Sequence, residues 1–101
     1  MSSGVTMTYT IQGLIDEIRI SLPEDYIITG MDDALIKAAF TAEELGEVVK
    51  AIAHEEPREI VKECADTIVG LLQIMDYYND RGDFGIDSAF NETLQRLKSK
   101  K

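Results

Sequence analysis

The part of the sequence that decides the fold runs from Asp32 to Asn79 and reads DDALIKAAFTAEELGEVVKAIAHEEPREIVKECADTIVGLLQIMDYYN. Apolar residues recur there with the 3.6-residue period of an α-helix, both before and after Pro57. Proline is favoured at the first position of a helix, where its missing N–H has no partner to lose. The stretch therefore predicts two long helices. One begins near Asp32 or Asp33, either of which can cap it, and ends at the turn at 55–57, and the other runs from Pro57 to about Asn79.

The first of these helices carries an apolar stripe, and the second is apolar over more than half of its circumference. The stripe consists of Leu35, Ala38, Ala39, Ala42, Leu45, Val49 and Ile52. The apolar residues of the second helix are Ile60, Val61, Cys64, Ile68, Val69, Leu71, Leu72, Ile74 and Met75. A helix with so wide an apolar face is normally buried on two sides. In so short a chain we expect a second subunit to cover one of them.

Two shorter helices are expected outside this pair. Upstream, Thr10 or Thr8 can cap a helix that Pro23 prevents from extending far, with Ile11, Leu14, Ile15 and Ile18 on its apolar face. Downstream, Asp87 can cap a last helix that carries Ala89, Phe90, Leu94 and Leu97. No strand pattern is present in the sequence. We therefore predict an all-α, four-helix bundle-like protomer that forms one domain over residues 1–101, with residues 1–8 flexible.

Length and charge exclude several classes of function. The chain has 101 residues, which suits one small domain, and its 10 Lys and Arg against 19 Asp and Glu give a formal net charge of −9. Such an excess repels nucleic acids and anionic membranes, so neither is an expected partner. The apolar runs are too short to span a bilayer, and no signal peptide is evident. The single Cys64 cannot form an internal disulfide, so we expect a cytoplasmic protein.

Two acidic motifs interrupt the predicted helix pair. Glu43, Glu44 and Glu47 share an arc of about 100° on the first helix, and Glu63 and Asp66 share a face of the second. Like charges at such spacings repel, so they stabilise neither helix. Each motif lies about six to eight residues from the short turn, and antiparallel helices would place both at similar heights. The alternative is a set of solvated charges on exposed faces, whereas converging carboxylates would form a site for Mg²⁺ or Mn²⁺.

The EExxE motif followed by ExxD, on two helices of an acidic chain of this length, resembles the MazG-like all-α nucleoside triphosphate pyrophosphohydrolases. The resemblance covers about Leu35 to Lys98 and includes Gly-Ile-Asp at 85–87. It implies a homo-oligomeric enzyme, a dimer or tetramer, that uses Mg²⁺ to cleave a nucleoside triphosphate between its α- and β-phosphates, giving the monophosphate and pyrophosphate. By that likeness the metal ligands would be Glu44, Glu47, Glu63 and Asp66. The catalytic candidates are Glu44 and Glu43, the latter as an extra ligand or as the base that orients the attacking water.

The residues that would contact the substrate depart from the family pattern. Many relatives have a lysine three residues before the two adjacent glutamates, where this chain has Phe40, and its nearest upstream lysine is Lys37. The last helix offers Arg96 and Lys98 in place of the family's Lys-Asn-Arg type of patch. Tyr77 lies further along the Asp66 face. These five are the candidate substrate-binding residues. The alternatives are that Phe40 belongs to the core, that Tyr77 is a surface tyrosine and that the basic end of the last helix is merely solvated.

Three other functions are compatible with the sequence. A phosphoribosyl-ATP pyrophosphohydrolase shares the helical carboxylates, although the missing lysine before Glu43 and Glu44 argues against it. A nucleotide-sequestering protein of the same fold would have less need of the complete carboxylate set. An acidic helical interaction module without a ligand would show no change in melting temperature with Mg²⁺.

Overall fold

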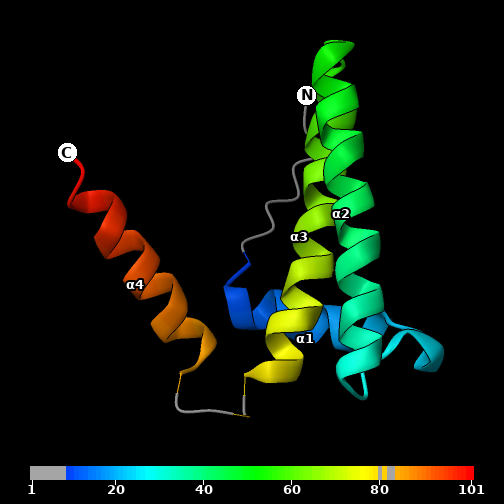
Figure 1. Cartoon of the computed structure of the whole chain (residues 1–101), viewed down its shortest axis with the longest axis vertical. Helices are drawn as coiled ribbons and strands as arrows, with labels where there is room; N and C mark the ends of the chain where they lie inside the picture. The colour runs from blue at the N-terminus through cyan, green and yellow to red at the C-terminus, as the bar shows by residue number, and fades with distance from the viewer. Residues whose placement is uncertain (1–8, 80, 82–83) are drawn as a thin grey trace.

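The computed structural model describes residues 9–79, 81 and 84–101, so the flexibility expected of residues 1–8 lies outside the described part. Within these ranges the chain forms α-helices and a short 3-10 helix, without a strand (Figure 1). The elements are α1 (Ile11–Ser21), η1 (Glu24–Tyr26), α2 (Met31–Ala53), α3 (Pro57–Tyr78) and α4 (Ile86–Lys98). The predicted all-α class is thereby confirmed. No helix in the described ranges is both long and apolar enough to cross a membrane.

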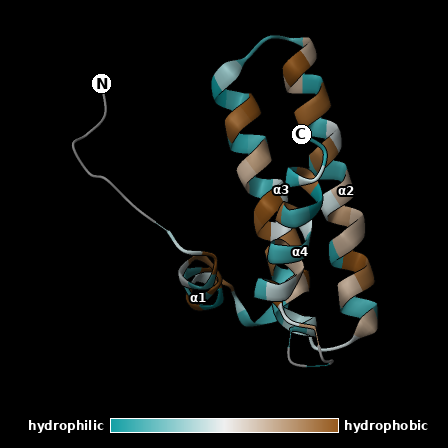
Figure 2. Cartoon of the chain, turned by 90° about the vertical axis from the view of Figure 1, so that its left-hand side faces the viewer, coloured by the Kyte–Doolittle hydropathy of each residue, from teal (hydrophilic) through white to brown (hydrophobic). Residues whose placement is uncertain are grey.

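Helices α2 and α3 form the antiparallel hairpin that dominates the fold (Figures 1 and 2). Glu55 has a φ of 52°, the left-handed conformation that commonly ends a helix. Its N–H donates to the carbonyl of Ile52 at 3.0 Å, and the N–H of Glu56 donates to that of Ala51 at 3.2 Å. These two bonds satisfy carbonyls that the end of α2 would otherwise leave unpaired. Pro57 then occupies the first turn of α3, as predicted.

The other two helices attach to the hairpin at one end. Ile15, Leu72 and Ile86 form a small core cluster there, one residue from each of α1, α3 and α4. Helix α1 lies across α3, and the guanidinium of Arg19 donates to the carboxylate of Asp76, with 2.8 Å between Nε and Oδ2 (Figures 1 and 2). Beyond Ile86, α4 points away from the hairpin (Figure 1). The single chain is therefore a hairpin with two attached helices, within the four-helix bundle-like protomer that the sequence suggested.

The apolar stripe predicted along α2 faces away from α3. The α2 residues that are buried are Ala34, Thr41, Val48 and Ala51, whereas the large members of the stripe are more than half exposed. Both arcs of α2 carry apolar or small residues, so helical periodicity alone did not determine which arc meets α3. The arc that meets α3 is the one with the smaller side chains, which lets the two helices approach more closely. The stripe is thus left for a contact beyond this chain.

Helix α2 begins close to the predicted position, but its capping residue differs from the prediction. The helix begins at Met31 after Gly30, and neither Asp32 nor Asp33 is its cap. The Asp33 carboxylate instead accepts hydrogen bonds from the N–H and the hydroxyl of Thr29, at 2.9 and 2.7 Å. Both hydrogen bonds hold the pKa of Asp33 below its ordinary value, and the bond from the hydroxyl has the larger effect. This acid therefore fixes the connector to the first turn of α2.

The capping residue of α4 also differs from the predicted one, whereas that of α1 agrees with the prediction. Gly85, not Asp87, is the cap residue of α4. The side-chain oxygen of Asn79 accepts a 2.9 Å hydrogen bond from the N–H of Ile86, which ties the end of α3 to the start of α4. At α1, the hydroxyl of Thr10 accepts from the N–H of Gly13, as a capping threonine does.

Helices α2 and α3 approach closely where Gly70 faces Thr41, and both residues are buried. A Cβ atom on residue 70 would clash with the Thr41 hydroxyl and lie 3.3 Å from Cβ and Cγ2 of the same side chain. That hydroxyl donates to the carbonyl of Lys37 at 2.7 Å, which fixes its position. The contact therefore requires a glycine at position 70.

We predict that Gly70→Ala destabilises the protein by about 1–3 kcal/mol, because the added methyl forces α2 and α3 apart. Thr41→Ala removes the clashing hydroxyl, so the double variant should recover part of the loss in a double-mutant cycle measured by urea unfolding.

Gly46→Ala is the matched control, because a Cβ at this helical position meets no described atom within 4 Å. It should leave stability unchanged or raise it by up to about 1 kcal/mol through helix propensity. Equal effects of the two glycine substitutions would contradict the close contact.

Candidate metal centre

The Thr41–Gly70 contact sets the relative height of the two acidic motifs. Glu44 lies one turn after Thr41 on α2, and Asp66 lies one turn before Gly70 on α3. Glu63 lies one further turn towards the hairpin end. One carboxylate oxygen from each of Glu44, Glu63 and Asp66 lies within 4.8 Å of the others, and we call these three residues the acidic cluster. Two of the predicted ligands on α3 thus meet one from α2.

The acidic cluster is electrostatically strained without a cation. Glu44 and Glu63 are half-buried between the helices, and Asp66 is more exposed. Burial is the largest cause that raises the pKa of Glu44, followed by its hydrogen bond with Glu63 and by repulsion from Glu63 and Asp66. Three carboxylates in this arrangement favour any positive charge that can reach them.

Lys62 supplies such a charge in the protein itself. Its Nζ lies 3.4 Å from Oε1 of Glu63 and 3.6 Å from Oδ2 of Asp66. The negative charge of Asp66 is the largest cause that raises the pKa of Lys62 above its ordinary value, followed by its interactions with Glu63 and with Glu59. This lysine was not among the residues predicted for the site, although its i,i+4 spacing from Asp66 is the usual spacing of a helical ion pair.

The donor set of the acidic cluster fits a small hard cation. All three residues offer carboxylate oxygen, which is the ligand type that Mg²⁺ and Mn²⁺ prefer. Opposite ligands of an octahedral Mg²⁺ ion are about 4.2 Å apart, given Mg–O distances of about 2.1 Å. Oxygens within 4.8 Å of one another can therefore reach one ion by modest rotation of their side chains. The cluster is a possible metal site.

The other two predicted glutamates lie outside this cluster. The side chain of Glu43 is exposed, and Glu47 is exposed with an oxygen 4.0 Å from Nζ of Lys50. Glu47 and Glu63 nevertheless line the same shallow hollow near the hairpin turn. Glu47 therefore lies beside the acidic cluster rather than within it.

The predicted substrate-binding residues fall into three places. Lys37 and Phe40 line a hollow together with Glu44 and Asp66 of the acidic cluster. Tyr77 lines a separate cavity, and the guanidinium of Arg81 lies 4.0 Å from the centre of its ring. Arg96 and Lys98 lie on the exposed α4, which the single chain does not bring to the cluster (Figure 1).

The helical hairpin and its acidic cluster define an all-α protein with a possible cation site made by carboxylates of two adjacent helices. Comparison with protein families agrees, because the model of the MazG nucleotide pyrophosphohydrolase domain matches residues 33–101. This match covers more than half of the chain, which therefore belongs to the MazG nucleotide pyrophosphohydrolase family. No curated protein and no solved structure gives a significant match.

We predict that Lys62 and a divalent cation compete for the acidic cluster. Lys62→Met removes the competing ammonium group, so Mg²⁺ should raise the melting temperature of this variant by a few degrees more than that of the wild-type protein. Without Mg²⁺ the variant should melt at a lower temperature, because its carboxylates have lost their counter-charge. Thermal melts in EDTA and in Mg²⁺ measure both effects.

Lys100→Met, at the exposed C-terminal end, is the control for the loss of one positive charge. Its Mg²⁺-induced shift should equal that of the wild-type protein. If the Lys62 and Lys100 variants respond equally to Mg²⁺, Lys62 is not a competitor of the cation.

Proposed function

We propose that the protein is a Mg²⁺-dependent nucleoside triphosphate pyrophosphohydrolase that releases pyrophosphate from a ribo- or deoxynucleoside triphosphate. The observation that carries this proposal is the convergence of Glu44, Glu63 and Asp66 within 4.8 Å, in a chain of the MazG family. A triphosphate is strongly negative and so is this chain, with a net charge of −9. Binding therefore requires bridging cations, which the acidic cluster is suited to hold.

In this proposal the acidic side chains divide into ligands and a base. Glu44, Glu63 and Asp66 hold the cation, and Glu47 joins them by rotation of its exposed side chain. Bound Mg²⁺, or Mn²⁺, would neutralise phosphate charge and polarise the α-phosphoryl group. Glu43, or a free oxygen of Glu44, accepts the proton of the water that attacks the α-phosphorus as the bond to pyrophosphate breaks.

The residues around the acidic cluster suggest how the triphosphate is held. Lys37 is half-buried in the hollow that contains Glu44 and Asp66, so its ammonium group is the nearest predicted phosphate contact. Phe40 lines the same hollow and offers an apolar wall. Arg96 and Lys98 become substrate contacts when α4 of a neighbouring copy is placed over the site.

A homo-oligomer is part of the same proposal. The stripe on α2 leaves Leu35, Leu45, Val49 and Ile52 each more than half exposed, and Val61 on α3 is 70% exposed. Exposed apolar side chains gathered along one helix face mark an association surface. A dimer or tetramer would bury it.

Two alternatives make different predictions about products. A phosphoribosyl-ATP pyrophosphohydrolase would act on that nucleotide in preference to common triphosphates, and Phe40 in place of the family lysine argues against it. A sequestering protein would bind the triphosphate and Mg²⁺ without releasing pyrophosphate. A screen of pyrophosphate release over ribo- and deoxynucleoside triphosphates and phosphoribosyl-ATP separates all three.

We predict that Glu63→Gln and Glu47→Gln each lower pyrophosphate release by about 100-fold or more, because each removes a charged ligand. The substitutions keep side-chain size, so the melting temperature in EDTA should stay the same or rise. Glu17→Gln, on the exposed face of α1, is the control and should keep full activity. Unchanged activity of the Glu63 or Glu47 variant would remove that residue from the mechanism.

We predict that Val49→Glu shifts the protein from an oligomer to a monomer in light scattering coupled to gel filtration. A charge in the middle of the apolar stripe would have to be desolvated on association, which is costly for an unpaired carboxylate. Gln12→Glu on α1 adds the same charge at an exposed position away from the stripe and from α4, and it should leave the mass unchanged. A monomeric wild-type protein would refute the proposed assembly.

A further inference from the structure

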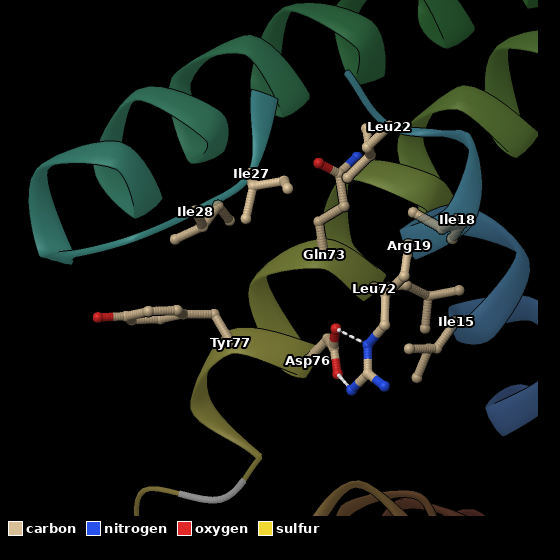
Figure 3. A pocket seen from close by; sticks show the side chains of 10 residues that line it. All are labelled: Ile15, Ile18, Arg19, Leu22, Ile27, Ile28, Leu72, Gln73, Asp76 and Tyr77. Carbon is tan, nitrogen blue, oxygen red and sulfur yellow. Dashed lines mark hydrogen bonds and ion pairs between the residues drawn. The ribbon is translucent and has the colours of Figure 1, made fainter. Parts of the chain in front are cut away.

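A second hollow lies next to the acidic cluster. It is an apolar cavity of about 320 Å³ between α1, the connector that precedes α2, and the last turns of α3 (Figure 3). Ile15, Ile18, Leu22, Ile27 and Ile28 form much of its wall. The ion pair between Arg19 and Asp76, and the ring of Tyr77, line other sides of it (Figure 3). Mostly apolar hollows of this size with a few polar groups are typical ligand sites.

Gln73 connects this cavity with the acidic cluster. Its side chain lines both the cavity and the hollow that contains Glu44 and Asp66. Within residues 9–79, 81 and 84–101, the Oε1 atom of Gln73 is buried and has no hydrogen-bond partner. An unpaired buried carbonyl is unfavourable in the free protein and becomes satisfied when a ligand brings an N–H group. Rotation of the amide into the cavity breaks no hydrogen bond of this oxygen.

The spacing along α3 suits a nucleotide. Asp66 and Gln73 are two helical turns apart, about 10 Å along the axis. A nucleotide that extends over this distance would have its phosphates at the acidic cluster and its base at the cavity. The apolar walls can cover the faces of a flat heterocycle. The amide of Gln73 offers an acceptor and a donor side by side, which is the pattern that pairs with the edge of a base.

We propose that the cavity binds the nucleobase of the substrate and that the Gln73 amide pairs with the edge of that base. The inference rests on the proposed function for the phosphate end of the ligand. It goes beyond the family match, because the wall residues from Ile15 to Ile28 precede residue 33, where that match begins. The segment from α1 to the connector would therefore determine which base is accepted.

Nucleoside titration of the ¹⁵N-labelled protein in EDTA tests the cavity separately from the acidic cluster. Uridine, cytidine, adenosine and guanosine carry no phosphate, so their binding requires no metal. At least one of them should cause saturable NMR shifts of the Gln73 side-chain NH₂ pair and of the backbone amides of Ile15 and Ile28. Gln73→Leu should weaken this binding by about tenfold or more, because the edge pairing is lost.

The stability of Gln73→Leu distinguishes a binding role from a structural one. The substitution removes the buried unpaired oxygen, so the melting temperature should equal or exceed that of the wild-type protein. If this variant fails to fold, Gln73→Glu keeps the side-chain shape while it removes the NH₂ donor, and it should also weaken binding. Gln95→Leu on the exposed α4 is the matched control and should bind as the wild-type protein does.

Three results would overturn the inference: no saturable shift with any of the four nucleosides, shifts confined to residues outside the cavity, or equal affinity in the wild-type protein and Gln73→Leu. Nucleoside binding in the cavity of a protein that releases no pyrophosphate would support the base site and refute the proposed function. Pyrophosphate release without nucleoside binding would support the proposed function and refute the base site.

Discussion

The close approach of α2 and α3 at Thr41 and Gly70 is the constraint on which the acidic cluster depends. A side chain at position 70 would push the helices apart, and the Thr41 hydroxyl is held by the Lys37 carbonyl. One turn from this contact, both towards the hairpin turn, lie Glu44 and Asp66. A separation of the helices by a few tenths of an ångström would therefore change the spacing of the oxygens that would share one ion in the proposed site. Packing and the proposed chemistry are linked at this level of the hairpin.

The acidic cluster brings like charges together in the free protein, and a lysine of the same chain offsets part of the repulsion. Burial and neighbouring carboxylates raise the pKa of Glu44, and Lys62 compensates part of the negative charge. A lysine held by two exposed or half-exposed ion pairs contributes little to stability and is easily displaced. Lys62 is thus an internal counter-charge of the kind that a divalent cation would displace in the proposed site. Gln73 is a second unsatisfied group of this kind, beside the cluster.

Much of this arrangement could be predicted from the sequence, and the remainder could not for identifiable reasons. Pro57 and the helical periodicity predicted the hairpin, and motif spacing predicted that Glu44 would meet Glu63 and Asp66, although the assignment of ligand roles stays a prediction. Periodicity left open which arc of α2 faces α3, because this depends on the complementary shapes of Thr41 and Gly70. Helix caps at Gly30 and Gly85 were missed because nearby aspartates are the commoner capping residues. The partnerless Gln73 oxygen is a property of tertiary packing and leaves no pattern in the sequence.

The position of α4 has a consequence for how this protein behaves as an isolated chain. Beyond Ile86 this 13-residue helix is anchored by no buried residue within the described part of the chain, and its apolar side chains Phe90, Leu94 and Leu97 face solvent. Helices of this length are marginal in water when they have nothing to pack against. Amide hydrogens of α4 should therefore exchange with solvent far sooner than those of the hairpin, and the rate of that exchange would report directly on whether another surface has come to cover the helix.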